Sequence, residues 1–295
     1  MSEKRLEKKS KQDANKHKLP NLPVAIQGYE GSFHQVAARS FYGKHVEILP
    51  CATFTDVIKN ASSKKATMGG IMAIENSIAG SIIPNYALID KYNLHIIGEE
   101  YLHIHHHLMG LNGQKIKDIK EIWSHPMALL QCKEFFKKHP HIKLVEDVDT
   151  AEVAKRIAKE TLVGIAAIAP KIAAEIFDLE VLEDEIQTMK DNATRFVIVQ
   201  TQEPTHKIDH INKASLKFQL NHKRGSLAAI LNVLSDCKMN LTKIQSLPVI
   251  EMPWKYSFFV DVTFDNYKNF EKAKAIIAIM AEEFKVLGTY KNGRE

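Results

Sequence analysis

The stretch DNATRFVIV, residues 191–199, joins four polar side chains to an apolar run. Such a run is typical of a strand that enters a hydrophobic core. A core normally excludes a guanidinium such as that of Arg195, because a buried charge loses its hydration. Asp191, Asn192 and Thr194 add further polarity at the same point. We therefore expect this strand to begin at a cleft and to continue into the core.

Short apolar runs alternate with helix-like patterns from Pro23 to about residue 200. The expected strands are 24–27, 46–49, 69–74, 94–98, 121–124, 142–146, 163–169 and 195–199. The expected helices, apolar at helical spacing, are 33–43, 55–62, 84–92, 126–138, 150–160 and 171–178. Strands that alternate with helices predict an α/β domain over residues 22–200, with parallel sheets covered on both faces.

The last part of the chain has a different order of expected strands and helices. A polar stretch at 201–212 marks a linker. After it come a strand, a helix, two strands, a second helix and a last strand, within residues 213–292. This βαββαβ order predicts a separate α+β domain.

The charge is concentrated at the start of the chain. Of the net charge of +5, residues 1–20 carry +4 through seven Lys or Arg and three acids, which leaves about +1 for the other 275 residues. This tail has too little apolar surface to offset the entropy of ordering, so we expect residues 1–21 to be disordered. The nearly neutral body argues against a nucleic-acid partner.

Several other classes are excluded by the residue pattern. No apolar run approaches the ~20 residues that span a bilayer, and the tail lacks the apolar core of a signal peptide. We expect a cytoplasmic protein with no membrane partner. The three cysteines are odd in number and far apart, which favours free thiols. His103, His105 and His107 lie close together without a cysteine or carboxylate at ligand spacing, so no metal site is expected.

Two polar clusters each follow an expected strand and open an expected helix. In GYEGSFHQ, residues 28–35, glycines permit a tight turn and Ser32 can cap the helix, whose free N–H groups suit an anion. In AIENSIAGSI, residues 73–82, Glu75, Asn76 and Ser77 close a buried strand. They are either helix caps or ligand-binding groups, because parallel sheets bind ligands at the carboxyl ends of their strands.

The third cluster is SHPMALLQC, residues 124–132. Ser124 is expected to cap the helix, Pro126 fits its first turn, and His125 ends the strand in a structural or a catalytic role. Together with Arg195, the three helix starts suggest a cleft for a small polyanion, for which a dicarboxylate is the best candidate. Arginine suits bidentate binding of a carboxylate.

Taken together, these segments resemble prephenate dehydratase. The family pattern is similar at GYEGSF, IENSIAGS, SHPMALLQC, DTAEVAK, AAIAP and DNATRF, in the same order. Residues 213–292 resemble an ACT domain, the amino-acid-sensing module usually attached to this enzyme. The resemblance implies a two-lobed catalytic domain like a type-2 periplasmic binding protein, with crossings near residues 98–102 and 180–190. No chorismate mutase domain is expected before the first strand.

The family reaction converts prephenate to phenylpyruvate, water and carbon dioxide, the committed step towards phenylalanine. It needs no cofactor, because the substrate becomes aromatic. By resemblance, Thr194 donates a hydrogen bond to the leaving oxygen, Arg195 anchors or polarises a carboxylate, and Ser77 completes the catalytic set. The residues expected to bind substrate are Glu30, Gly31, Ser32, Glu75, Asn76, Ser77, Ser124, His125, Asn192 and Phe196.

Some positions depart from the family pattern. Tyr29, Ser32 and His34 replace the usual proline, threonine and serine, and Met127 replaces a glutamine. In the C-terminal domain, the family's GAL and ESRP segments correspond to 225–227 and 245–248. The residues expected to bind phenylalanine as an effector are Gly225, Ser226, Leu227, Gln245 and Ser246. ACT domains of this kind pair with one another, so a homodimer or homotetramer is expected.

Two rival functions remain open. Arogenate dehydratase acts on a substrate that has an amino group in place of the keto group, and no residue decides between the two substrates. A non-catalytic amino-acid sensor would also combine a binding cleft with such a module. The intact NATRF segment, residues 192–196, argues against a pure sensor, which has no need of Thr194 beside Arg195.

Overall fold

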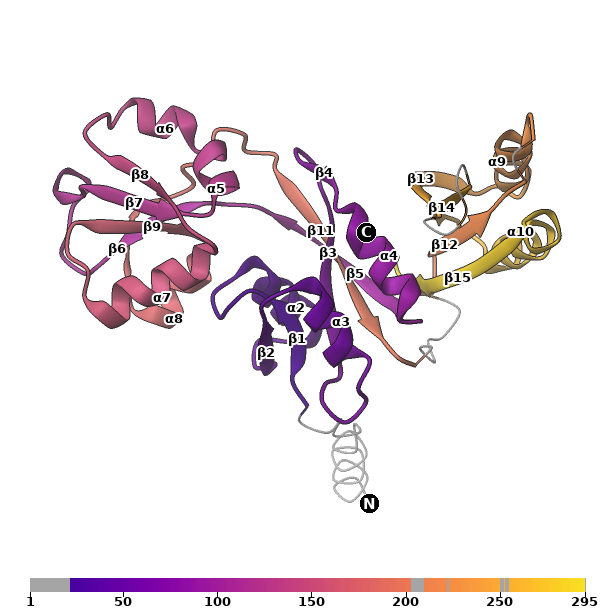
Figure 1. Cartoon of the computed structure of the whole chain (residues 1–295), viewed down its shortest axis with the longest axis horizontal. Helices are drawn as coiled ribbons and strands as arrows, with labels where there is room; N and C mark the ends of the chain where they lie inside the picture. The colour runs from indigo at the N-terminus through magenta and orange to yellow at the C-terminus, as the bar shows by residue number, and fades with distance from the viewer. Residues whose placement is uncertain (1–21, 203–209, 222, 250–251, 253–254, 295) are drawn as a thin grey trace, which may run out of the picture.

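The computed structural model describes residues 22–202, 210–221, 223–249, 252 and 255–294. The predicted tail 1–21 and most of the predicted linker lie outside these residues. Three sheets follow one another across the molecule (Figure 1). Two belong to an α/β region with two lobes, and the third belongs to a smaller C-terminal domain. The predicted α/β fold followed by a βαββαβ domain is confirmed.

Lobe 1 contains a six-stranded sheet of order β2-β1-β3-β11-β5, with a short β4 beside β3. Its strands are β1 (Val24–Gln27), β2 (Ile48–Cys51), β3 (Gly69–Asn76), β4 (Gly80–Ser81), β5 (His95–His103) and β11 (Ala193–Gln200). Its helices are α2 (Phe33–Tyr42), α3 (Phe54–Ala61) and α4 (Ile83–Lys91). Helix α2 packs on one face of the sheet, whereas α3 and α4 pack on the other.

Lobe 2 contains a five-stranded sheet of order β10-β6-β9-β7-β8. Its strands are β6 (His107–Gly110), β7 (Glu121–Ser124), β8 (Lys143–Glu146), β9 (Ile165–Ala169) and β10 (Glu180–Glu183). Its helices are α5 (Pro126–Gln131), α6 (Lys133–Lys137), α7 (Thr150–Glu160) and α8 (Lys171–Phe177), with a 3-10 turn η2 (Ile116–Asp118). Helices α5 and α6 cover one face, and α7 and α8 cover the other.

Both sheets are mixed, which corrects the prediction of parallel sheets. Strand β11 runs antiparallel to both β3 and β5, and in lobe 2 the strands β6 and β10 are antiparallel to their neighbours. The reason is the path of the chain, because β11 returns from lobe 2 and enters lobe 1 from the edge at which β3 ends. The first residues of β11 therefore lie beside the last residues of β3.

The lobes are joined by residues 104–106 and 184–192. The predicted first crossing at 98–102 is wrong, because those residues lie within β5 and pair along their length with β11. The predicted second crossing at 180–190 begins too early, since 180–183 form β10. Both corrections arise because strands continue into polar sequence as far as a neighbouring strand accepts their hydrogen bonds.

The C-terminal domain has the order β12 (Lys213–Gln219), α9 (Ser226–Asp236), β13 (Asn240–Pro248), β14 (Tyr256–Thr263), α10 (Tyr267–Met280) and β15 (Glu283–Tyr290). Its antiparallel sheet has the order β13-β14-β12-β15. Helices α9 and α10 pack on one face of this sheet. The other face lies against lobe 1.

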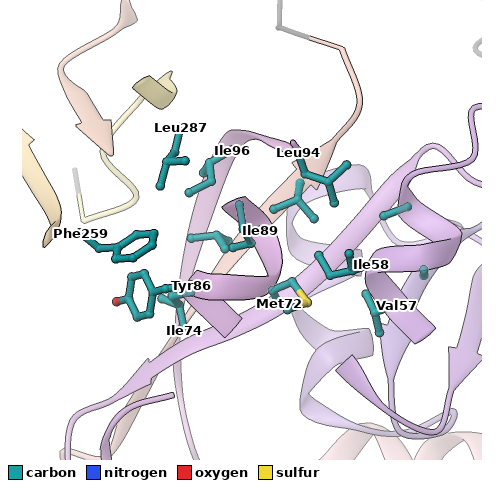
Figure 2. Packing of buried hydrophobic residues seen from close by; sticks show 14 of the residues in the cluster. Val57, Ile58, Met72, Ile74, Tyr86, Ile89, Leu94, Ile96, Phe259 and Leu287 are labelled. Carbon is teal, nitrogen blue, oxygen red and sulfur yellow. The ribbon is translucent and has the colours of Figure 1, made fainter. Parts of the chain in front are cut away.

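One hydrophobic cluster spans the junction between lobe 1 and the C-terminal domain. Figure 2 shows Phe259 and Leu287 of the C-terminal domain beside Tyr86 and Ile96 of lobe 1. The rings of Tyr86 and Phe259 have centroids 5.5 Å apart. Strand β15 also approaches β5 closely, because a Cβ added to Gly288 would collide with the Ile96 carbonyl group. Lobe 1 and the C-terminal domain thus share this cluster, beside a cluster that lies within each of them.

Candidate active site

The side chains at the junction of β3 and β11 alternate between two faces of the lobe 1 sheet. Thr194 pairs with Asn76, and the next pair is Arg195 with Glu75. Because neighbouring residues of a strand point to opposite faces, Thr194 and Arg195 face opposite sides. Phe196 packs in the cluster on the α2 face, together with the residues on which α2 rests. Thr194 therefore shares the α2 face, and Arg195 faces the C-terminal domain.

Asn76 holds the Thr194 hydroxyl as an acceptor. The Oδ1 atom of Asn76 accepts the N–H groups of Ile78 and Ala79, at 3.0 and 2.9 Å. These two donors fix the orientation of the amide, so that Nδ2 faces Thr194 and donates to its Oγ1 at 2.9 Å. With its oxygen in use as an acceptor, the hydroxyl keeps its own hydrogen for donation.

The same amide begins a polar chain that joins the lobes. Asn76 Nδ2 also donates to Asn192 Oδ1 at 2.7 Å, and Asn192 Nδ2 donates to Gln131 Oε1 at 3.1 Å. Gln131 Oε1 lies 2.8 Å from His106 Nε2. Burial lowers the pKa of His106 to about 4, so the ring is neutral and its Nε2 hydrogen completes the chain. The predicted residues Asn76, Asn192 and Thr194 are brought together here.

The predicted glycine turn lies before α2. Gly28 and Gly31 have φ of 88° and 83°, which favours glycine. Ser32 is buried and caps α2 by accepting the Gln35 N–H at 3.4 Å, whereas Glu30 is exposed. An added Cβ on Gly31 would lie 3.0 Å from the Cβ of Ala173 in α8, so the turn abuts lobe 2. The first-turn amides of α2 have no acceptor within the helix.

Helix α2 also places His34 against β11. The ring of His34 meets Phe196 edge to face at 5.0 Å and lies 5.5 Å from Phe54. Burial lowers the pKa of His34 to about 4, and its Nε2 atom is buried without a hydrogen-bond partner among the described residues. His34 is thus a neutral ring that packs Phe196, which itself is almost fully buried.

Arg195 does not lie in the cleft, which corrects its prediction as a substrate anchor. Its Nε atom donates to Glu99 Oε2 at 2.7 Å, Nη1 is paired with Asp261, and Nη2 donates to the Tyr290 hydroxyl at 2.9 Å. The Arg195 side chain is only 4% exposed. Each of the three nitrogens has a partner on the face that meets the C-terminal domain, so the buried guanidinium is directed away from Thr194 and its cleft.

Glu75 lies on that same face, which corrects its prediction as a substrate-binding residue. Its Oε1 atom is 2.6 Å from Nζ of Lys243 in β13, and the same ammonium donates to the Ser81 hydroxyl at 2.7 Å. A bulge in the β3–β11 ladder causes this placement, because Glu75 pairs with Arg195 while the next pair is Ala73 with Phe196. The extra residue of β3 reverses the face on which Glu75 would otherwise lie.

The remaining predicted residues differ in their placement. The Ser77 hydroxyl accepts the Ala193 N–H at 2.9 Å, which ties the end of β3 to the start of β11. Ser124 is fully buried and donates to the Ile168 carbonyl at 2.9 Å, so its prediction as a helix cap and substrate ligand is wrong. His125 is the actual cap of α5.

Three further residues, which the sequence does not predict as site residues, lie against this site. Gln131 ends the SHPMALLQC segment, so the motif itself contains this signal. His34 stands out in the sequence only as a departure from the family pattern. His106 carries no signal, because nothing in the sequence places it beside Gln131, which is 25 residues further along the chain.

The described residues offer no site for a metal ion. No group of three or more His, Cys, Asp and Glu among them could hold one. His107 instead contacts Asp184 at 2.9 Å. In the same part of the chain no helix is long and apolar enough to cross a membrane. The three cysteines are free thiols, as predicted.

The predicted effector residues fall into two groups in the C-terminal domain. Ser226 and Leu227, just after Gly225 at the start of α9, line a cavity of about 120 Å³. Gln245 and Ser246 do not line this cavity, and Gln245 Nε2 donates to the Ser246 carbonyl at 3.0 Å. The other cavity residues are Leu220, Asn221, Lys223, Lys255, Tyr256 and Phe258.

Comparison with known proteins places this site in a family. The family model for prephenate dehydratase matches residues 24–204. The chain is 36% identical over 247 residues to arogenate dehydratase/prephenate dehydratase 2, chloroplastic, of Arabidopsis thaliana, which covers 81% of the chain and 64% of that protein. The chain thus spans less than two thirds of that relative's length.

Two solved structures share the fold. One is GqqA, described as a novel type of quorum-quenching acylase, with a TM-score of 0.80, 26% identity and coverage of 91% and 97% of the two chains. The other is prephenate dehydratase from Arthrobacter aurescens in complex with L-Phe, with a TM-score of 0.83, 24% identity and coverage of 92% and 91%. On the family match, which includes every residue of the Asn76–Thr194 site, the chain belongs to the prephenate dehydratase family.

Proposed function

We propose that the chain is a prephenate dehydratase that forms phenylpyruvate, water and carbon dioxide on the route to phenylalanine. Arogenate is the alternative substrate, and the Arabidopsis relative carries both activities in its name. The bond between the ring and its carboxylate breaks, and its electron pair enters the ring. The bond to the 4-hydroxyl then breaks, and the oxygen takes up a proton and leaves as water.

The hydrogen bond from Asn76 to Thr194 is the observation that carries this proposal. A threonine hydroxyl is a weak acid, so its contribution is a directed hydrogen bond to the departing oxygen. Asn76 occupies the oxygen of Thr194 as an acceptor, which aims the remaining hydrogen away from Asn76. The first-turn amides of α2 supply donors for a substrate carboxylate.

The likeness to an acylase supplies a rival reaction, acyl transfer from an amide. A hydroxyl nucleophile in such an enzyme needs a base that removes its proton. Among the described residues, no carboxylate or imidazole is hydrogen-bonded to the Thr194 hydroxyl, whose partner Asn76 is a donor. This arrangement favours a role for Thr194 as a donor over a role as a nucleophile.

The proposal is tested by the formation of phenylpyruvate, read by its absorbance in alkali. The full chain is supplied with prephenate, with arogenate and with an N-acylated amine in separate reactions, without added metal or nucleotide. Turnover of prephenate is the expected result. Phenylalanine from arogenate alone would assign arogenate dehydratase, and release of the acyl group alone would replace the proposal with an acylase. No turnover of any of the three would favour a sensor.

We propose further that the C-terminal domain is an ACT domain that binds phenylalanine as an effector. The cavity beside α9 supports this, because Lys223 and Lys255 line it together with the aromatic residues Tyr256 and Phe258. A zwitterionic aromatic amino acid offers a carboxylate for the ammonium groups, of which that of Lys255 is also paired with Glu282, and a ring for the aromatic wall. The Arthrobacter protein of similar fold was solved with L-Phe.

Inhibition of turnover by phenylalanine, compared with tyrosine, tests the effector. Phenylalanine is expected to inhibit, and Lys255→Met is expected to weaken that inhibition without loss of basal turnover. A wild-type protein that responds to neither amino acid would contradict the effector proposal.

We also propose a homodimer or homotetramer through this domain. Strand β13 ends the sheet, and Ile276, Ile279 and Met280 of α10 are exposed. Light scattering of the full chain is expected to give twice or four times the mass of the chain, and a monomer would contradict it.

A further inference from the structure

The residue after Thr194 is held by two domains at once. Arg195 donates to Glu99 of β5, at 2.7 Å, and to Asp261 of β14 in the C-terminal domain. Its third nitrogen donates to the Tyr290 hydroxyl of β15 at 2.9 Å. The guanidinium is planar and its donors lie in a fixed fork, so three acceptors from three strands define its position.

The cluster is closed and electrically balanced. Lys213 of β12 donates to both oxygens of Glu99, at 2.8 and 2.9 Å, so Glu99 and Asp261 together balance Arg195 and Lys213. The side chains of these four residues are between 0% and 5% exposed. The Ser215 hydroxyl completes the cluster through Asp261 and Tyr290. Lys213 also donates to the Tyr101 hydroxyl at 3.1 Å, and the Gly293 N–H donates to Glu99 at 3.0 Å. The cluster thus consists of three side chains of lobe 1, four of the C-terminal domain and one backbone N–H group.

A buried charge cluster is weak evidence of added stability. The cost of removing two charges from water largely offsets their attraction, whereas loss of one partner leaves an unpaired buried charge. The cluster holds β11 at the point where the β3–β11 ladder shifts register, between Arg195 and Phe196. This shift disrupts the ladder with β3 one residue beyond Thr194, whereas the ladder with β5 continues through Thr194 and Arg195.

We propose that Arg195 is a positioning residue through which Asp261 of the C-terminal domain holds the start of β11 and thereby the Thr194 hydroxyl. The C-terminal domain then supports catalysis even when no effector is bound. This inference rests on the proposed function of Thr194. The contrasting explanation is that the cluster only attaches one domain to the other.

The interface offers a matched control for that explanation. Lys217 of β12 pairs with Asp90 of α4 at 2.7 Å, so this ion pair also crosses from the C-terminal domain to lobe 1. Neither residue contacts β11 through a hydrogen bond or an ion pair among the described residues. Lys217→Gln therefore removes an ion pair from the same interface without touching the catalytic strand.

The experiment compares the full-length variants Asp261→Asn, Asp261→Glu and Lys217→Gln. Asp261→Asn is expected to lower kcat by about tenfold or more with little change in KM, because misplacing a catalytic group costs turnover. It is also expected to speed hydrogen–deuterium exchange in peptides of residues 193–200. Asp261→Glu is expected to restore part of the turnover, and Lys217→Gln to match the wild type in both readouts.

Two outcomes would overturn the inference. A folded Asp261→Asn protein with wild-type kcat and wild-type exchange in 193–200 would remove the role of Arg195. Equal losses in Asp261→Asn and Lys217→Gln would reduce the cluster to attachment between domains. If the wild type turns over neither prephenate nor arogenate, the proposed function fails, and the exchange of 193–200 alone decides whether Asp261 holds β11.

Discussion

The Asn76 amide determines which atom of Thr194 is available to a substrate. Asn76→Asp keeps the size of the side chain and the acceptor for the N–H groups of Ile78 and Ala79. It replaces the Nδ2 donor with a carboxylate oxygen, so the Thr194 hydroxyl would donate to the new carboxylate instead of to the substrate. We expect kcat to fall by about 100-fold, the scale of losing a directed donor.

Initial rates of phenylpyruvate formation measure this effect, and circular dichroism serves as the control for folding. If the kcat of Asn76→Asp stays within about threefold of the wild-type value, the loss is far smaller than that expected for a directed donor. That result would show that the Asn76 amide does not orient the Thr194 hydroxyl.

Two neutral histidines make the protein sensitive to acid. Burial lowers the pKa of His34 and of His106 to about 4, from an ordinary value of 6.5. Between pH 6.5 and 4 the unfolded chain binds protons at these rings that the folded protein does not bind. Stability is therefore present above pH 6.5 and falls as the pH drops to 4, by up to about 3 kcal/mol for each ring.

Urea unfolding at several pH values measures this slope. His34→Phe is expected to flatten it between pH 6.5 and 4, whereas the same change at His45, which is exposed, is expected to leave it unaltered. An unchanged slope in His34→Phe would contradict the assignment of His34 as a buried neutral ring.

The sequence predicted one site for Thr194, Asn76 and Asn192, which the structure brings together, but it misplaced Arg195. The alternation of a strand already puts Thr194 and Arg195 on opposite faces, so both cannot enter one cleft. Arg195 was predicted to face the cleft because the family resemblance and the affinity of arginine for carboxylates both favour that placement. The side of the sheet on which Glu75 lies could not be predicted from sequence. It depends on a register shift in the β3–β11 ladder, and no residue in the sequence indicates that shift.

At the scale of elements, the close approach of β15 to β5 depends on Gly288. An added Cβ there would collide with the carbonyl group of Ile96. We expect Gly288→Ala to push the strands apart and to destabilise the protein by about 1–3 kcal/mol, as overpacking commonly does. Gly110→Ala is a milder control, because its new methyl group would meet its nearest atom at 3.3 Å.

Thermal unfolding and the exchange of peptides from β15 measure the change. A Gly288→Ala protein as stable as the wild type, with unaltered exchange in β15, would show that this contact does not limit the docking of the domain.

Most elements could be predicted from apolar runs and helical spacing, but their directions could not. Strands β6 and β10 were missed because neither is a continuous apolar run: His107–Gly110 begins with a histidine and ends with a glycine, and Glu180–Glu183 begins and ends with a charged residue. The antiparallel course of β11 follows from the second passage between the lobes. This passage depends on the path of the whole chain, so the direction of β11 cannot be predicted from the residue pattern of the strand.

At the scale of the whole molecule, the shared cluster predicts how the protein unfolds. Tyr86 and Ile96 of lobe 1 pack with Phe259 and Leu287 of the C-terminal domain in one cluster, beside a separate cluster within each. Among the described residues, no cluster joins lobe 2 to either of them. We expect lobe 1 and the C-terminal domain to unfold as one cooperative unit. Native-state hydrogen exchange should therefore give similar opening free energies for β3 and β14.

Much weaker protection of β14 than of β3 would contradict this prediction, because it would mean that the C-terminal domain opens alone. It would also weaken the positioning role of Arg195, whose partners Asp261 and Tyr290 belong to that domain.

The central claim is that the Thr194 hydroxyl assists the departure of the substrate's hydroxyl. The most direct measurement is kcat for prephenate in Thr194→Val, which keeps the shape of the side chain, beside Thr194→Ser, which keeps the hydroxyl. The account predicts a loss of about 100-fold or more in Thr194→Val and a much smaller loss in Thr194→Ser. Near-normal turnover in Thr194→Val would contradict the account.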